Sequence, residues 1–401
     1  LFLLVLITPH FGYGAMDAEM ASRKSTGTYV DAVPPPGANI VRGMWIFRVK
    51  RPPGSPPVFK ARYVARGFCQ RQGVDYFQTF SPTPKMTTLR VLLHVAAHRD
   101  YELHSLDFST AILQGQPARG DLAAPPTWLH WDFSSWHPVE PPAASLRSPP
   151  GTAPVAVSTH RHFSATVLHP RVLQRFGFTY SSPQATPLST RHSLSALPSD
   201  ESVESSGPYP ELVGCLMYLM TCTRPDLAYP LSILARYVAP GRHRPEHKAA
   251  AKRVLCYLCS TSGMGLVLGG RSPVVLTGHA DTSWADDQAT QRSSQGYTFS
   301  LGSGSVSWRV TRSSSVLGSS CEAEIYAGAM AAQELRWLTY LLTELGEPPR
   351  SPPVLYVDNK AMLALCREQR QEHRTKHIAL HYFLARKLQQ RGQLRLSYVA
   401  S

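Results

Sequence analysis

The alternation of apolar runs and helical patterns between residues 273 and 399 constrains the fold more than any other feature of the chain. Val274–Ala280 and Val354–Val357 read as short buried strands, and the long amphipathic stretch Cys321–Leu345 lies between them. Such a helix is the crossover that two parallel strands require. We therefore expect an α/β fold (α+β over the whole chain) with a mixed sheet covered by helices. The other predicted elements are strands at Gly296–Leu301, Ser305–Val310 and Leu394–Val399 and helices at Lys360–Arg367 and Thr375–Arg391.

Three acidic residues accompany these elements. Asp281 follows the first strand, Asp358 follows the strand Val354–Val357, and Glu324 lies in the first turn of the long helix. Taken alone, Asp281 is a turn residue and Asp358 a helix N-cap. Their order on adjacent parallel strands and a crossover helix instead predicts that the carboxylates converge. Clustered oxygen ligands suit Mg²⁺ or Mn²⁺, and two such ions can promote phosphodiester hydrolysis.

Glu322 and Glu324 compete for the helical position in this cluster. Ser319 followed by Glu322 fits a capping box, in which the glutamate reaches back to the cap amide. Glu324 instead begins a series of small and then leucine side chains at three- and four-residue steps, which predicts a face that packs on the sheet. We therefore assign Glu324, and not Glu322, to the cluster. The series continues through Gly328, Ala331, Leu335, Leu338 and Leu342.

A basic hairpin is predicted near the start of the chain. Gly43–Lys50 and Val58–Ala65 read as two strands joined by a Pro-Gly turn, Pro52–Ser55. The inward side chains are then Trp45, Phe47, Phe59 and Tyr63. The outward cations are either a solvated surface or contacts to phosphate; the candidates for nucleic-acid binding are Lys60, Arg62 and Arg66.

The remaining segments differ in composition. Helices are predicted at Ala15–Ser25 and Thr87–His98, the latter with Leu89, Leu92, Leu93 and Ala96 at helical spacing, and a strand over Leu103–Phe108 carries Asp107 near its end. Residues 117–170 are rich in Pro, Ala and Ser, which is typical of linkers or disorder. A helical region with a shared leucine core follows, at Arg171–Phe178, Tyr209–Thr221, Asp226–Val238 and Glu246–Ser260.

The charge balance favours a polyanionic partner. The chain has 41 Lys and Arg against 27 Asp and Glu, a formal net charge of +14, so nucleic acid is the first candidate and a merely basic surface the alternative. Leu1–Ile7 is too short for a membrane span and lacks a basic signal-peptide region. The seven scattered cysteines favour a reducing compartment. We expect an intracellular protein, cytoplasmic or nuclear, without a membrane anchor.

Several motifs in their chain order resemble copia-type retrotransposon Pol polyproteins. The reverse-transcriptase part of that family is resembled by Lys60–Phe68, Phe80–Pro82, Thr88–Arg90 and Glu102–Asp107, and the segment after its palm by Glu211–Leu219 and Thr223–Ala228. Its ribonuclease H domain is resembled by Ser319–Tyr326, Tyr356–Asn359 and Arg374–Ile378. The implied division is an unassigned flank at 1–14, partial fingers and palm at 15–116, a low-complexity segment at 117–170, a connection region at 171–270 and a ribonuclease H-like domain at 271–401.

The departures from the family pattern bear on function. The family polymerase combines an aspartate resembling Asp107, a metal ligand, with a Tyr-x-Asp-Asp hairpin, and no such hairpin occurs between Gln116 and Val172. We therefore expect no polymerase activity. The family also places a fourth acid beyond the position of Ser401, so we expect a truncated ribonuclease domain. The basic group Arg374, Lys376 and His377 could hold a substrate phosphate or be an ordinary basic surface.

The resemblance implies Mg²⁺-dependent hydrolysis of the RNA strand of an RNA–DNA hybrid by Asp281, Glu324 and Asp358. RNA, DNA and their hybrid are the expected partners. Two alternatives stay open: a non-catalytic nucleic-acid-binding relic with the same fold, and a different nuclease or integrase built on that fold.

Overall fold

The computed structural model divides into two compact units, residues 1–82 with 104–155 and residues 83–103 with 156–401, and each is described by itself. The structure describes residues 9–27, 33, 36, 40–50, 56–71, 84–105, 155–156, 162–164, 168–189, 194, 208–239, 241–270, 273–302, 304–367 and 379–400.

The first unit contains the predicted basic hairpin and a helix that packs against it. Strands β1 (Gly43–Lys50) and β2 (Val58–Ala65) pair antiparallel at the predicted bounds, with Gly43 opposite Ala65. Helix α2 (Pro9–Ser25) contacts β2 and begins before the predicted Ala15. Trp45 and Phe47 are half-buried and Tyr63 is buried, as the alternation predicts. The short elements η1 (Gly67–Cys69) and β3 (His104–Ser105) also belong to this unit, and β4 (Val155–Ala156) begins at its last residue.

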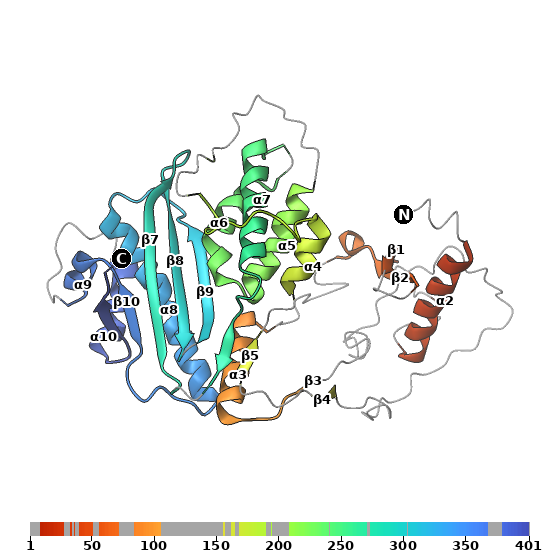
Figure 1. Cartoon of the computed structure of the whole chain (residues 1–401). Helices are drawn as coiled ribbons and strands as arrows, with labels where there is room; N and C mark the ends of the chain where they lie inside the picture. The colour runs from red at the N-terminus through yellow and green to blue at the C-terminus, as the bar shows by residue number, and fades with distance from the viewer. Residues whose placement is uncertain are drawn as a thin grey trace. The chain divides into compact units, whose positions relative to one another are not determined.

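The second unit is built on a five-stranded mixed sheet with the order β11-β10-β7-β8-β9 (Figure 1). The strand β7 is antiparallel to β8, β8 is antiparallel to β9, and β10 runs parallel to both β7 and β11. This confirms the mixed sheet and the parallel pair on which the site prediction depends. The strand bounds are β7 (Leu276–Asp287), β8 (Arg292–Leu301), β9 (Gly304–Arg312), β10 (Val354–Val357) and β11 (Arg395–Tyr398).

Helix α8 (Ser320–Glu344) connects β9 to β10 and packs on β7 and β8. The predicted face is buried: Leu335, Leu338 and Leu342 are each at most 1% exposed. Each such side chain stabilises the fold by about 1.5–3 kcal/mol through burial. Helix α10 (Ala379–Gln390) lies beside α8, and α9 (Lys360–Arg367) packs on both.

One glycine in β7 is required by this packing. A Cβ at Gly278 would lie 2.2 Å from a ring carbon of Phe299, which is fully buried on β8. Glycine therefore allows the phenyl ring to lie directly against the neighbouring backbone. The same core layer contains Leu276, Ala280, Leu355 and Val357, all buried.

A helical region precedes the sheet in sequence and packs on its β9 side. Its helices are α4 (Leu168–Phe176), α5 (Tyr209–Cys222), α6 (Ala228–Leu234) and α7 (Pro245–Ser260), with the short turns η4 (Pro225–Leu227) and η5 (Ala235–Tyr237). The predicted shared core of Leu231, Leu234, Val254, Leu255 and Leu258 is confirmed. Helix α6 contacts β9, and the Trp308 indole of β9 donates to the Met220 carbonyl oxygen of α5 at 3.1 Å. The strands β5 (His162–Ser164) and β6 (Val267–Gly269) pair beside this region.

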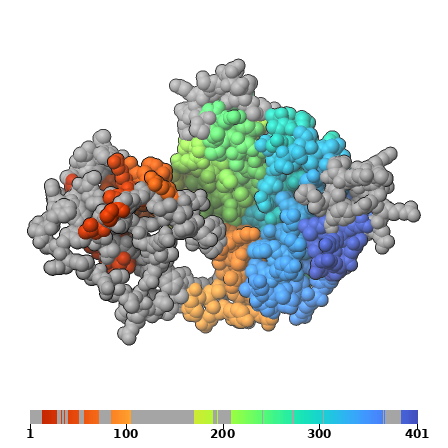
Figure 2. Space-filling view, turned by 180° about the vertical axis from the view of Figure 1, so that it is seen from behind, coloured from red at the N-terminus to blue at the C-terminus, as the bar shows by residue number. Residues whose placement is uncertain are grey.

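Helix α3 (Met86–Arg99) exists as predicted. Of its predicted face, Ala96 is buried and Leu93 packs against the core, but the other two leucines face solvent. Leu89 and Leu92 are each 44% exposed, whereas Val91 and Val95 are buried. The helix packs on β6 and β9, and its place on this body is visible in orange in Figure 2. Arg90 decides the orientation: its guanidinium donates to the Val306 and Thr221 carbonyl oxygens, both at 2.6 Å. These remote acceptors cannot be inferred from the leucine spacing.

The strand β7 also departs from the prediction. It begins at Leu276 rather than Val274, and it continues through Asp281 to Asp287, where the sequence analysis ended it at Ala280. Asp281 therefore lies within a strand and not at its end. A break in the pairing register with β8 between Ser283 and Asp287 accompanies the extension. Bulges of this kind increase local twist and redirect side chains.

Several predictions fall outside the described residues. These are the turn at Pro52–Ser55, the polymerase-type Asp107, most of the low-complexity segment 117–170, and the basic group Arg374, Lys376 and His377. Among the helices that the structure does describe, none has both the length and the hydropathy of a membrane span.

Candidate metal centre

The parallel pairing of β7 and β10 brings two of the predicted carboxylates together. Tyr356 of β10 is opposite His279 of β7. Continuing that register by two residues places Asp358 beside Asp281, and residues two apart on a strand project from the same face. The backbone amide of Thr282 donates to Asp281 Oδ1 at 2.8 Å and holds that carboxylate in place.

Asp358 is not the cap of the following helix. The Asn359 side-chain oxygen accepts from the Met362 backbone amide at 2.9 Å, which is the N-cap interaction for α9. The capping interpretation of Asp358 was therefore placed one residue too early. Because Asn359 satisfies the helix end, the Asp358 carboxylate is left to the cluster.

The two glutamates of α8 divide their roles as predicted, with one shift. The Glu322 amide donates to the Ser319 hydroxyl oxygen at 3.1 Å, and Glu322 Oε2 accepts from the Gly318 amide at 2.7 Å. The glutamate thus reaches one residue beyond the cap amide that the capping-box prediction specified. Glu324 is directed to the strands instead, and it is only 6% exposed.

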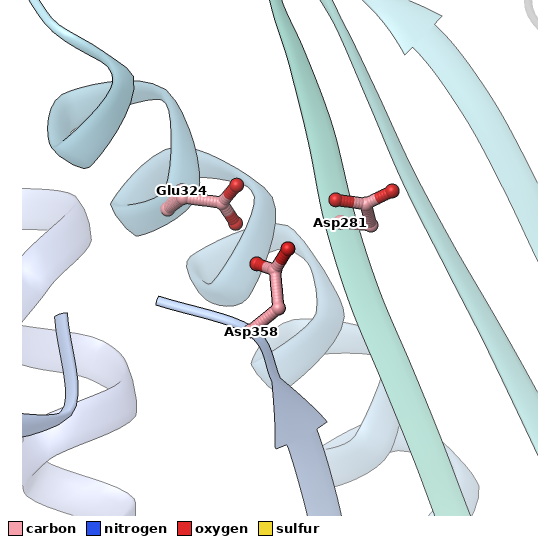
Figure 3. A group of neighbouring side chains, drawn as sticks. All are labelled: Asp281, Glu324 and Asp358. Atoms are coloured by element: carbon pink, nitrogen blue, oxygen red, sulfur yellow. The ribbon is translucent and has the colours of Figure 1, made fainter. Parts of the chain in front are cut away.

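The carboxylates of Asp281, Glu324 and Asp358 form one compact group (Figure 3). A ligand oxygen from each lies within 4.8 Å of the others. Asp281 is exposed, Asp358 is half-buried and Glu324 is buried, so the group opens to solvent on the Asp281 side. This geometry is that of a site able to hold a hard divalent cation.

The electrostatics of the group are unfavourable without a cation. Burial, together with the charges of Asp358 and Asp281, raises the pKa of Glu324 to about 8. Burial also raises the pKa of Asp281, an effect that the Thr282 amide opposes and the charge of Asp358 reinforces. Among the described residues, Glu324 Oε2 is a buried oxygen with no hydrogen-bond partner. A divalent cation would give this oxygen an interaction partner, so the residues present fit Mg²⁺ or Mn²⁺.

The predicted nucleic-acid contacts of the first unit lie on its hairpin. Lys60 and Arg62 are exposed and Arg66 is half-buried. Lys60 is directly opposite Arg48, which is also exposed. Like charges in opposite positions on a sheet are destabilising, and an anion placed over them removes that cost.

The polar sequence around Asp286 and Asp287 is typical of a solvated loop, but both carboxylates are held by other groups of the protein. Asp287 is buried and forms ion pairs with Arg312 at 2.7 Å and Arg236 at 3.2 Å. Asp286 accepts from the amide and the hydroxyl of Ser294, at 2.7 and 2.6 Å. The two arginines are remote in sequence, so no local pattern could have identified them as partners of Asp287.

Comparison with known proteins places the chain in a family. The reverse transcriptase (RNA-dependent DNA polymerase) family matches residues 28–127. The retrovirus-related Pol polyprotein from transposon TNT 1-94 of Nicotiana tabacum is 29% identical over 464 residues, covering 93% of this chain and 34% of that protein. The corresponding protein from transposon RE2 of Arabidopsis thaliana is 30% identical over 471 residues, covering 96% of this chain and 32% of that protein. The chain belongs to the copia-type retrotransposon Pol polyproteins.

This Pol chain spans about a third of the length of these relatives. The family resemblance deduced from the motifs is thereby confirmed. Among solved structures, RNase H1 from Halobacterium salinarum NRC-1 shares 13% identity with a TM-score of 0.23, over 31% of this chain and 85% of that chain. The assignment rests on the sequence relatives.

Proposed function

We propose that the second unit of this Pol chain is a ribonuclease H-type hydrolase that cuts the RNA strand of an RNA–DNA hybrid. The observation that carries the proposal is the carboxylate group Asp281, Glu324 and Asp358, with oxygens within 4.8 Å of one another and one buried oxygen unpaired. Membership of a Pol family supports a nucleic-acid substrate. Contacts to 2′-hydroxyls would distinguish the RNA strand from DNA.

The proposed roles follow from the environment of each side chain. The three carboxylates would hold Mg²⁺ or Mn²⁺, which when bound activates a water molecule and stabilises charge on the phosphate. Glu324 anchors the buried side of the site from α8. Asp281, fixed by the Thr282 amide, and Asp358, released from capping by Asn359, supply the open side.

We further propose that nucleic acid is held mainly by charge. The net charge of +14 and the exposed cations of the hairpin, including Lys60 and Arg62, support this. The proposed division of labour follows the family: partial fingers and palm at 15–116, a connection region at 171–270 and the hydrolase at 271–401. Templated polymerisation is not part of the proposal, because the sequence lacks the Tyr-x-Asp-Asp hairpin.

Hybrid cleavage in Mg²⁺ by four proteins tests the proposal: the parent chain, Asp358→Asn, Glu324→Gln and Glu322→Gln. We expect Asp358→Asn and Glu324→Gln to reduce cleavage by at least about 100-fold, because each deletes the charge of a direct ligand. Mutation of residues that only support a ligand already costs about 10- to 100-fold in activity or metal affinity. Glu322→Gln should retain activity, since glutamine also serves in a capping box. Thermal melts should show that all four proteins are folded.

The outcomes separate the competing functions. Loss of activity in Glu322→Gln but not in Glu324→Gln would reverse the assignment of the helical carboxylate. A parent chain that binds hybrid but cleaves nothing in Mg²⁺ or Mn²⁺ would favour the non-catalytic relic.

A further inference from the structure

Trp284 is a large apolar side chain that the proposed hydrolysis does not use. It lies on the extension of β7 beyond Asp281 and is 52% exposed. Its indole Nε1 donates to the Leu317 carbonyl oxygen at 3.1 Å. The polar edge of the ring is therefore satisfied by the protein, and much of the remaining ring surface is left to solvent.

Two elements connect this indole to the carboxylate group. Along β7, Trp284 follows Thr282, whose amide contacts Asp281, by two residues, or about 6.6 Å. Leu317 immediately precedes Gly318 and Ser319, which form the start of α8, the helix that carries Glu324. The hydrogen bond between Trp284 and Leu317 thus ties the indole to the residues that precede α8. Val316, the residue before Leu317, is 60% exposed.

The backbone that carries Trp284 is strained and firmly held. Ala285 has a φ of +51°, in the left-handed region, where a residue with a Cβ costs about 1–2 kcal/mol. Its amide donates to the Ser293 hydroxyl oxygen at 3.1 Å, and the following Asp286 and Asp287 are fixed by Ser294 and by two arginines. Strain that surrounding contacts maintain is concentrated at functional sites. The arrangement presents the indole in one orientation.

We propose that Trp284 contacts the substrate, with its ring packed against the sugar and base of a nucleotide next to the scissile phosphate. Nucleic acid offers this combination, an apolar base face adjoining a phosphate, and the Pol chain offers an apolar ring adjoining a metal-binding carboxylate group. The contact supplies affinity that does not depend on charge. The inference rests on the proposed hydrolase function and adds a positioning residue to it.

Binding to a labelled RNA–DNA hybrid tests the proposal in the Asp358→Asn background, in which the substrate is not consumed. Trp284→Ala should weaken binding roughly tenfold, in line with the contribution of one base–aromatic contact. Trp284→Phe should retain most of the affinity. The matched control is Tyr340→Ala: Tyr340 is 58% exposed on the same helix as Glu324, about 24 Å further along its axis.

Two further measurements separate contact from structure. Thermal melts should show that Trp284→Ala and Tyr340→Ala are folded at the assay temperature. Hybrid should quench the part of the tryptophan fluorescence that Trp284→Phe removes. Affinity in Trp284→Ala equal to that of the parent, or a loss shared by Tyr340→Ala, would overturn the inference. If the parent binds no hybrid, the proposed function fails as well. If the parent binds hybrid but cleaves nothing, the proposed hydrolase activity is wrong. The affinities of the Trp284 variants still test the proposed contact in that case.

Discussion

Glu324 is placed where it lowers the stability of the fold and favours the binding of a cation. Its carboxylate is buried at the start of α8, beside two other carboxylates, and its Oε2 has no hydrogen-bond partner. A buried, unpaired charge is costly, so without a cation the group holds a proton at a pH where an exposed glutamate would be ionised. Its pKa is raised to about 8. A bound cation would remove the electrostatic cost of ionising this side chain.

The pH dependence of stability should report this cost. The folded-state pKa of about 8 lies above the ordinary glutamate pKa of 4.5, so between these two pH values the folded chain binds a proton that the unfolded chain does not. The stabilisation is complete below pH 4.5 and is lost as the pH rises through 8. Urea unfolding in EDTA should therefore show stability that falls from pH 5 to 8, by up to about 1.4 kcal/mol per pH unit.

Glu324→Gln should remove most of that slope, and Glu322→Gln should keep it because Glu324 is intact. Adding Mg²⁺ should stabilise the parent more at pH 8 than at pH 5.5, since at the higher pH the cation displaces fewer protons from Glu324. A slope that is unchanged in Glu324→Gln would show that the raised pKa belongs to another group.

At the scale of the elements, the apolar periodicity was sufficient for the sheet and its crossover. The bounds of β1, β2, β10 and α9 agree with the predictions, and the parallel pair that aligns Asp281 with Asp358 could be deduced from chain order. Two departures share one cause. The orientation of α3 and the ion pairs of Asp287 depend on polar groups whose partners are remote in sequence. Local pattern cannot reveal such partners.

Two substitutions in helix α3 compare the face that the leucine spacing predicts to be buried with the face that the structure buries. Val91 is fully buried, whereas Leu92 is 44% exposed. Val91→Ala should therefore lower the free energy of unfolding by about 2 kcal/mol, as removal of buried methyl groups does. Leu92→Ala removes more atoms but should cost less than about 1 kcal/mol, because half-exposed positions are tolerant. Urea unfolding of both variants checks this. The reverse order would mean that the leucine spacing had identified the buried face correctly.

At the scale of the whole molecule, the Pol chain combines a localised acidic group with an excess of positive charge. The net charge of +14 attracts a polyanion to the surface at large, while the carboxylates repel phosphate unless a cation is present. Under the proposed function, affinity and hydrolysis would therefore depend on different residues, and loss of one would not require loss of the other.

Salt dependence measures how binding is distributed over the chain. The logarithm of the affinity for an RNA–DNA hybrid should fall linearly with the logarithm of salt concentration. The double substitution Lys60→Gln with Arg62→Gln should reduce the magnitude of that slope by up to about 2, since each phosphate contact contributes about 0.7–0.9. The matched control is Arg350→Gln with Lys387→Gln, which removes the same charge from exposed positions elsewhere. Equal changes in both double variants would mean that the charge acts diffusely and that the hairpin is not a defined contact. A response confined to the hairpin variant would locate nucleic-acid contacts on β2, and hydrolysis by the second unit could then be tested with that affinity known.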